Sequence, residues 1–366
     1  VGHPRTFASD DGPMHLRSSW FGTIAFDPAD AAAWAARAFA AERAFWGDTD
    51  PAPYRMFVRV LATMGERANG TGQASTFLSA IGPRTPFGVR LRSNIAHEMF
   101  HRWLGMRLRL TGPDGSSFWF TEGFTVYYSN RLMLRAGLVS PDEFLAEINA
   151  TAARHFANEH AAASNDEIRR RFFDDDALAV VPYTRGALYA AELDAAIRTA
   201  AHGTRSLDDV MRELYRAALV APVGPSGLRE LPEGAFRDAV AHELGASGTA
   251  RFDAVIARGG TPEPPSDAFG PCFERVARSY ALYQLGFDPK QSIVRKPGPV
   301  AAKAGLLDGD EIVSVESVNL MADQPAVVTV KRAGKQLVFR YLPAGANHDG
   351  YAWRRVTGVP DARCAK

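Results

Sequence analysis

The sequence predicts an α+β fold, in which a large domain of mixed sheet and helices is followed by a small β-rich domain. Residues 31–46 form an Ala-rich helical segment, and residues 94–104 have the apolar periodicity of a helix. Residues 327–342 have the pattern of two strands joined by a turn. Every Lys lies at or after Lys290, whereas the earlier part of the chain uses only Arg as its strong base. This change in composition indicates a separate C-terminal module.

We expect the chain to divide into four parts. A Gly- and Pro-rich stretch at residues 259–265 is typical of a linker between the large and the small domain. Within the large domain we expect a mixed sheet over about residues 21–86 and a mostly helical lobe over about residues 92–260, with a cleft between them. The expected parts are residues 1–28 as the end of an N-terminal β region, 29–265 as the large domain, 275–345 as the small domain and 346–366 as a tail.

The composition is that of an ordinary globular protein. The 366 residues carry a formal net charge of +1, so nothing indicates binding to nucleic acid or to an anionic membrane surface. No apolar run reaches the length of a membrane span. The chain begins at Val1 without Met or a signal peptide, and we expect that it is processed or shortened. These features leave a periplasmic, secreted or cytoplasmic location open.

The most informative motif is His-Glu-x-x-His at residues 97–101. Two His four residues apart lie one above the other on the same helix face, so His97 and His101 can converge on one Zn²⁺. Glu98 follows the first His and can reach a metal-bound water as a general base. The alternative is a helix that carries two ordinary His and an exposed Glu.

A catalytic zinc site needs a third protein ligand and one open position. Glu122 lies in an apolar, aromatic stretch, which follows a loop at residues 112–117 that carries turn and helix-start signals. Burial of a carboxylate in such a stretch is costly unless the group is paired or binds a metal. We therefore expect Glu122 to be the third ligand.

A phenol group supplies a candidate electrophile. Tyr183 precedes a helical run at residues 187–198. Attack of water on a peptide carbonyl builds an oxyanion, which a placed phenol O–H stabilises. A Tyr beside a helix start more often serves only in core packing.

These motifs resemble those of the gluzincin metallopeptidases, the thermolysin-like group whose third ligand is a Glu on a second helix. Aminopeptidase N relatives carry a similar His-Glu-x-x-His-x-Trp start, here residues 97–103, and a Val-Pro-Tyr-x-Lys-Gly motif, here residues 181–186 with Arg185 in the Lys position. The closer resemblance is to the glycyl aminopeptidase family. Its motifs are matched at residues 119–128, 185–188, 193–194 and 206–209, within a similarity that spans residues 34 to about 260.

The resemblance implies a thermolysin-like catalytic domain that hydrolyses peptide bonds. It implies that His97, His101 and Glu122 bind Zn²⁺, that Glu98 is the base, and that Tyr183 steadies the transition state. The family normally has a sizeable N-terminal β domain, of which residues 1–28 would be the end.

One departure concerns the substrate's amine. Aminopeptidases of this group carry a Glu on a Gly-rich strand before the first zinc His, and this Glu holds the free α-amine. Here the strand holds Gly70 and Gly72, and Gln73 occupies the position of the acid. An amide cannot offer the charge-assisted hydrogen bonds of a carboxylate. Glu66 is nearby in sequence and is a possible substitute. The stretch is expected to serve as an edge strand that pairs with substrate backbone, and the alternative is a plain surface turn.

The small domain resembles PDZ domains. Residues 300–315 are similar to the Ala-x-x-Ala-Gly-Leu-x-x-Gly-Asp-x-Ile core of that fold. Leu285, Gly286 and Phe287 resemble the loop whose backbone N–H groups capture a peptide C-terminal carboxylate. The alternative is a degenerate PDZ-like domain that only packs against the catalytic domain.

Cys272 and Cys364 bracket this small domain. The position suits a disulfide formed in an oxidising compartment, and two unrelated buried thiols are the alternative.

Other polar groups indicate no site. His155 and His160 are five residues apart on a probable helix over residues 140–163, and we expect a solvated face. His242-Glu243 lacks a second His and is expected at the surface, and the acidic residues 174–176 are expected in a solvated loop.

The sequence therefore predicts a zinc metallopeptidase, and the main hypothesis is an aminopeptidase of glycyl aminopeptidase type. Its partners would be peptide or protein substrates, with a peptide C-terminus as a further ligand of the small domain. One alternative is a zinc endopeptidase, because Gln73 replaces the amine-binding acid. The other alternative is a non-catalytic protein that binds peptides on the same scaffold.

Overall fold

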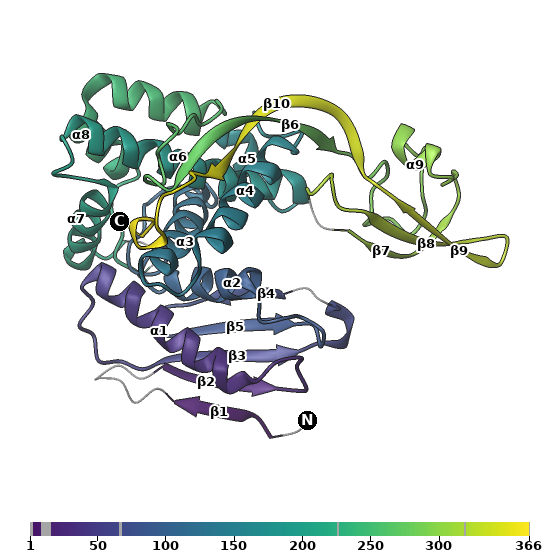
Figure 1. The fold of residues 1–366 in the computed structure, drawn as a ribbon, viewed down its shortest axis with the longest axis horizontal. Coiled ribbons are helices and arrows are strands. Elements are labelled where there is room, and N and C mark those ends of the chain that lie inside the picture. Colours follow the sequence, from purple (N-terminus) through teal and green to yellow (C-terminus); the bar gives the residue numbers. More distant parts are fainter. Residues whose placement is uncertain (1–2, 9–15, 66–67, 225–226, 318–319, 366) are drawn as a thin grey trace.

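The computed structural model of the chain describes residues 3–8, 16–65, 68–224, 227–317 and 320–365. A sheet forms one layer, helices cover it, and a long β-ribbon leads to a small domain at one side (Figure 1). The sheet and the helices that cover it share one hydrophobic core, as expected for an α+β fold. No helix in these ranges is long and apolar enough to cross a membrane.

The sheet is mixed, as predicted, and has the strand order β1-β2-β3-β5-β4. Strands β2, β3 and β5 are mutually parallel, whereas β1 and β4 run antiparallel to their neighbours at the two edges. The two N-terminal strands thus share a sheet with the large domain. The strands are β1 (Arg5–Ala8), β2 (Leu16–Phe21), β3 (Tyr54–Val60), β4 (Ala68–Gly72) and β5 (Thr76–Ile81).

Helix α1 (Pro28–Trp46) connects the parallel strands β2 and β3 and agrees with the predicted helix at residues 31–46. The side chain of Asp27 caps its first turn, and Gly47 ends it in a left-handed conformation at φ 62°. Its aromatic residues pack, as expected. The ring of Phe39 stacks on Tyr54, and the ring of Phe45 contacts Tyr128.

The helical lobe follows the sheet and shares one hydrophobic core with it. Its helices are α2 (Val89–Phe100), the π-helix η2 (Trp119–Phe124), α3 (Thr125–Arg135), α4 (Pro141–Phe156), α5 (Asn165–Arg171), α6 (Asp176–Ala200), α7 (Leu207–Val220), α8 (Ala235–Phe252) and the π-helix η3 (Asp253–Ala257). Short 3₁₀ turns are η1 (Ala62–Met64) and η4 (Asp361–Arg363).

Three helix boundaries differ from the prediction. The helix expected at residues 94–104 begins at Val89 and ends at Phe100, after which the chain turns. The helix expected at residues 140–163 ends at Phe156. The helix expected at residues 187–198 begins at Asp176, because Asp175 caps it with bonds to two backbone N–H groups.

The expectation of a solvated His155 is wrong. His155 is only 1% exposed, and burial, followed by the charges of Arg185 and His348, lowers its pKa to about 3. His160 pairs with Asp175 at 3.0 Å, so the two His do not share an environment. His242 is exposed as predicted, whereas Glu243 is buried beside Arg205 and accepts its hydrogen bonds.

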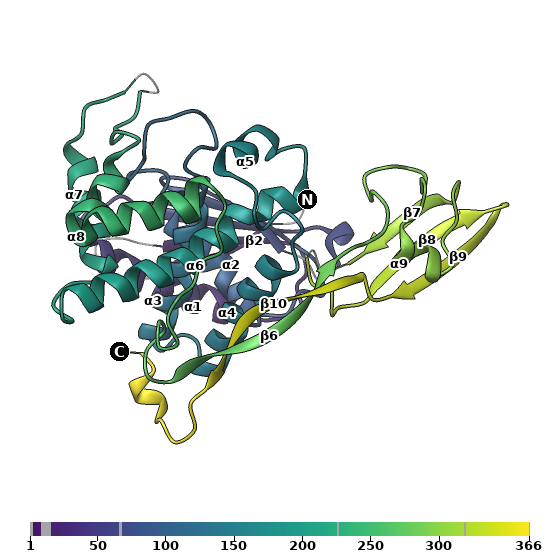
Figure 2. The same cartoon turned by 90° about the horizontal axis from the view of Figure 1, so that it is seen from above.

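The C-terminal part combines a ribbon and a small sheet. Strands β6 (Phe273–Tyr283) and β10 (Ala344–Arg355) pair antiparallel and lie over α4 (Figures 1 and 2). Between them, helix α9 (Pro299–Lys303) and the strands β7 (Glu311–Glu316), β8 (Ala326–Arg332) and β9 (Lys335–Tyr341) enclose a core of their own. Figure 2 shows this small domain projecting from the body of the molecule.

The loop compared with a carboxylate-capturing loop follows β6. Gly286 has φ 88° and lies so close to α9 that an added Cβ would be 2.6 Å from the Cβ of Ala301. Residues 287–292 then form turns, and the next bridge joins Ile293 to Glu311. Capture of a peptide by strand addition uses a strand edge beside such a loop. Peptide binding by Leu285, Gly286 and Phe287 therefore stays a prediction.

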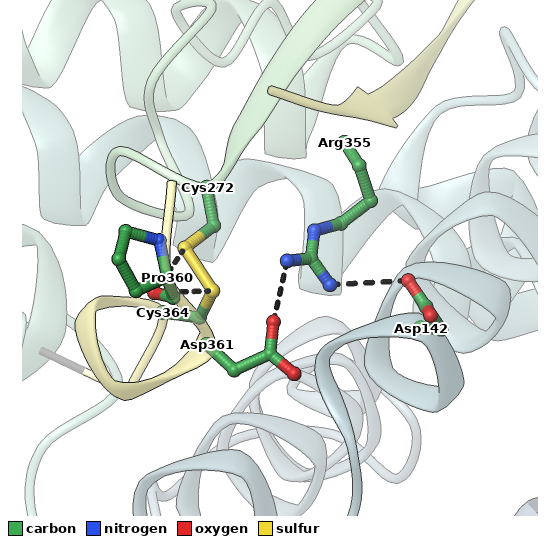
Figure 3. The surroundings of a disulfide bond; sticks show 6 residues. All are labelled: Asp142, Cys272, Arg355, Pro360, Asp361 and Cys364. Carbon is green, nitrogen blue, oxygen red and sulfur yellow. Dashed lines mark hydrogen bonds and ion pairs between the residues drawn. A yellow bond between two sulfur atoms is a disulfide. The ribbon is translucent and has the colours of Figure 1, made fainter. Parts of the chain in front are cut away.

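Cys272 and Cys364 form a disulfide, with 5.2 Å between their Cα atoms. The bond joins the start of β6 to the tail, as Figure 3 shows. Beside it, Arg355 pairs with Asp142 of α4 and Asp361 of the tail. The tail is thus fixed to the helical lobe.

Candidate metal centre and substrate cleft

Helix α2 positions the first two candidate ligands and the candidate base. His97 and His101 project from one face, and their ring nitrogens Nε2 are 3.1 Å apart. The Nδ1 of His101 lies 3.1 Å from the carbonyl oxygen of Leu104, in the turn that ends the helix. Because a proton on Nδ1 is held by this carbonyl, Nε2 stays free as a ligand.

Glu122 comes from η2, the π-helix that precedes α3. Its Oε2 lies 3.3 Å from the Nε2 of His97 and 3.3 Å from the Nε2 of His101. π-Helical turns are frequent at functional sites, and this one places a carboxylate from a second helix opposite the two imidazoles. In the described part of the chain, these three side chains are the one group of His, Cys, Asp and Glu close enough to hold a metal ion.

The three donor atoms fit Zn²⁺. Their separations of 3.1, 3.3 and 3.3 Å match the ligand-to-ligand distance of about 3.3 Å expected for tetrahedral zinc with bonds of about 2.0–2.1 Å. Two imidazoles and one carboxylate supply three ligands and leave a fourth position open, as in catalytic zinc sites. Burial raises the pKa of Glu122, but hydrogen bonds and charge from His101 and His97 outweigh it and hold the pKa well below the usual range. Glu122 is therefore ionised, as a ligand must be.

Glu98 lies between α2 and the edge strand β4. It is 7% exposed, and an added Cβ at Gly70 would lie 2.6 Å from its Cγ. An added Cβ at Gly72 would lie 2.2 Å from the backbone oxygen of Glu98 and 2.8 Å from the Cβ of His101. The two glycines therefore let the strand lie directly against α2, the helix that carries the two candidate His ligands.

The predicted edge strand is confirmed, since β4 is the last strand of the sheet. Gly70 and Gly72 face α2, and Gln73 lies exposed in the turn that follows β4, lining the cleft. The role of Gly70, Gly72 and Gln73 in binding substrate stays a prediction. Glu66, the possible substitute acid, lies outside the described residues.

Tyr183 lies inside α6, two turns after its start, and not before a helix as predicted. Its ring stacks on His97 with 6.0 Å between ring centres. Burial, then the charges of Glu122 and Glu98, raises the pKa of Tyr183 far above its ordinary value. The phenol therefore keeps its proton and is a hydrogen-bond donor at every physiological pH.

A buried ionic network, which the sequence reasoning missed, supports the site from behind. Asp48 accepts hydrogen bonds from the indole of Trp103 at 2.8 Å and from Arg107 at 3.0 Å. Arg102 is 1% exposed, contacts Asp48 and Asp50, and donates to the carbonyl of Ala74 at 2.7 Å. The network fixes the turn after α2 to the turn after β4. Its signal in the sequence is the pair Arg102 and Trp103 directly after His101, both of which carry side-chain N–H donors.

The candidate metal ligands open into a cleft of about 1440 Å³. Its walls come from β4, α2, η2, α3, α4 and α6, so it lies between the edge of the sheet and the helical lobe, as predicted. His97, Glu98, His101, Glu122 and Tyr183 all line it. The structure thus brings together all five residues predicted for the metal centre and its chemistry.

The sequence of this region matches a known family. The M61 glycyl aminopeptidase family matches residues 90–169, which include both candidate His ligands and Glu122 but not Tyr183. Leucine aminopeptidase 2 of Emericella nidulans is 30% identical over 96 residues, which are 25% of this chain and 15% of that protein. The chain therefore spans only a small part of the length of this curated relative.

The fold also has solved counterparts. An aminopeptidase N family protein of Idiomarina loihiensis has a TM-score of 0.67 at 14% identity, over 96% of this chain and 68% of that one. The M1 zinc metallopeptidase of Deinococcus radiodurans has a TM-score of 0.46 at 20% identity, over 72% of this chain and 53% of that one, which is too low to carry an argument. The chain is thus similar in fold to an aminopeptidase N family protein. The part that carries the candidate ligands is similar to the M61 glycyl aminopeptidases.

Proposed function

We propose that this chain is a zinc-dependent peptidase that acts as an aminopeptidase. The observation that carries the proposal is the triangle of His97 Nε2, His101 Nε2 and Glu122 Oε2, with sides that suit tetrahedral zinc. A base and a phenol donor line the same cleft. The similarity to M61 glycyl aminopeptidases over residues 90–169 supports the hypothesis of an aminopeptidase.

The roles of the residues follow from their chemistry. His97, His101 and Glu122 would hold the zinc ion, which supplies a Lewis acid that polarises the scissile carbonyl and acidifies water. Glu98 takes a proton from the attacking water and passes it to the leaving amine. Tyr183 donates its O–H to the oxyanion that forms on the carbonyl.

The free edge of β4 is suited to an extended substrate. The strand ends the sheet, so its outer backbone groups have no strand partner among the described residues. An extended peptide can add to such an edge by main-chain hydrogen bonds. Gln73 would then lie near the substrate's amino end, where the related enzymes are expected to hold the free amine. The finer assignment to a gluzincin with a PDZ-like domain at residues 275–345 belongs to this proposal as well.

The test is hydrolysis of a matched peptide pair, one member with a free amino terminus and the other acetylated, with and without a zinc chelator. We expect chelator-sensitive release of the N-terminal residue from the free peptide alone. Internal cleavage of both peptides would establish an endopeptidase instead. Hydrolysis of neither peptide by the zinc-loaded protein would contradict a peptidase and favour a peptide-binding protein.

A further inference from the structure

The cleft contains a cationic cluster away from the metal centre, formed by Arg90, Glu147 and Arg154. Arg90 lies on α2, seven residues before His97 and thus about 10 Å of helix rise from it. Glu147 and Arg154 lie on α4, seven residues apart and therefore on one helix face. All three line the same cleft as the metal-binding residues.

The charges of this cluster are not balanced. Two guanidinium groups and one carboxylate give a net charge of +1, and no carboxylate in the described ranges lies within 4 Å of either guanidinium. In contrast, Arg109 also lines the cleft but pairs with Glu230 at 3.3 Å, and Arg92 on the same helix as Arg90 pairs with Glu143.

Burial makes the imbalance costly. Burial lowers the pKa of Arg154 and the positive charge of Arg90 lowers it further, whereas the charge of Glu147 raises it without restoring the ordinary value. Burial also raises the pKa of Glu147, although the charges of Arg154 and Arg90 lower it in part. Arg90 is exposed, so this cost falls on Arg154, which is partly buried and has no carboxylate of the described residues within 4 Å. An anion that enters the cleft between the two guanidinium groups removes this cost. Arg is also suited to hold a carboxylate with two parallel hydrogen bonds.

The direction of the cleft defines which part of a substrate meets this cluster. Gly72 contacts the His101 end of α2, and Gln73 follows it, whereas Arg90 lies at the opposite end of the same helix. If the amino end of the substrate lies near Gln73, its leaving part extends toward Arg90. An extended chain advances about 3.3 Å per residue, so the cluster lies roughly two or three residues beyond the scissile bond.

We propose that Arg90 and Arg154 form a subsite for an anionic carboxylate on the leaving side of the substrate. The inference rests on the proposed peptidase function and adds a substrate class to it. The carboxylate has two sources. It is either the C-terminus of a tripeptide or tetrapeptide, or an acidic side chain two or three residues after the scissile bond in a longer peptide.

Binding tests the subsite without turnover. Calorimetric titration of zinc-loaded Glu98→Gln protein would compare tetra-alanine with its C-terminal amide, and an amidated pentapeptide carrying Glu at the fourth position with its Gln counterpart. We expect the acid member of at least one pair to bind roughly tenfold more tightly. Preference in the first pair identifies a C-terminus, and preference in the second pair identifies a side chain. Equal affinity within both pairs would overturn the proposal.

Variants in the same background assign the preference to the cluster. Arg90→Gln and Arg154→Gln should each reduce it several-fold, whereas Glu147→Gln should increase it, because that change removes the opposing charge. Arg109→Gln is the matched control, since its guanidinium is already paired, and it should leave the preference unchanged. An unaltered preference in both Arg90→Gln and Arg154→Gln would also overturn the proposal. Hydrolysis of neutral amidated peptides by the unmodified protein reports separately on the proposed function.

Discussion

Gly123 of η2 and Gly186 of α6 touch through their backbones. A Cβ added to Gly123 would lie 2.4 Å from the Cα of Gly186, and one added to Gly186 would lie 2.2 Å from the backbone oxygen of Trp119. Real side chains do not tolerate such distances. This contact brings the helix that carries Glu122 against the helix that carries Tyr183, so the candidate metal ligand and the phenol reach the same cleft.

Replacement of Gly186 by Ala should therefore separate the two helices. The new methyl group would meet backbone atoms, which cannot turn aside, and we expect a loss of about 1–3 kcal/mol in the free energy of unfolding. Peptidase activity should fall by a larger factor than the decrease in the fraction of folded protein. The control is Gly234→Ala, where the nearest atom beyond the chain neighbours is 3.9 Å away. Equal stability and activity in the two variants would contradict this account.

Tyr183→Phe tests the phenol O–H. The ring would still stack on His97, whereas the donor to the oxyanion would be lost. We expect kcat to fall by roughly 10²–10³, with little change in KM, because the hydrogen bond forms mainly in the transition state. Steady-state kinetics on a free-amine peptide measure both constants. A rise in KM with kcat unchanged would show that Tyr183 only binds substrate.

Asp48→Ala tests the network behind the site. Arg102 would keep a buried charge and lose one of its two carboxylate partners, and Trp103 would lose the acceptor of its indole N–H. We expect the free energy of unfolding to fall by roughly 3–5 kcal/mol, which is the usual cost of breaking a buried ion pair. Denaturant unfolding measures it. Asp166→Ala, which removes an exposed helix-surface pair with Arg169 and Arg170, should leave the free energy of unfolding almost unchanged, because solvent screens such a pair.

His155 makes stability depend on pH. Its pKa is about 3 in the folded protein and about 6.5 in an unfolded chain. Between these values the unfolded state binds a proton that the folded state does not, so stability falls as the pH is lowered from about 6.5 toward 3. We expect His155→Leu to flatten this part of the profile, measured as urea-unfolding free energy at pH 7 and pH 4.5. Parallel profiles for the two proteins would contradict the assignment.

The candidate metal centre can be predicted from the sequence because its signals are local. The spacing of His97 and His101 is a helix repeat, and Glu122 is conspicuous as an acid among aromatic residues. The mixed sheet, the helical lobe and the C-terminal module were predicted from the same kinds of pattern and from the resemblance. The predicted start of α6 is wrong, since Asp175 is a typical N-cap that starts the helix at Asp176, and Pro182 lies inside it.

The remaining errors concern contacts between segments distant in sequence. Nothing local shows that Gly72 lies on Glu98 or that Gly123 lies on Gly186, because a glycine is also the ordinary residue of a turn. The polar neighbours of His155 in the sequence wrongly favour a solvated position. A better signal was its position seven residues after the apolar Ile148, which puts both side chains on one buried helix face.

The most direct test of the central claim measures zinc content and hydrolysis of a free-amine peptide in parallel, for the unmodified protein and for Glu98→Gln. We expect both proteins to bind about one zinc ion per chain. The unmodified protein should lose activity to a chelator and regain it with zinc, whereas Glu98→Gln should be slower by a factor of about 10²–10⁴. Glu230→Gln, which alters another carboxylate of the cleft, is the control and should keep its activity within a few-fold. Full activity of zinc-loaded Glu98→Gln, or activity of the unmodified protein without zinc, would contradict the account.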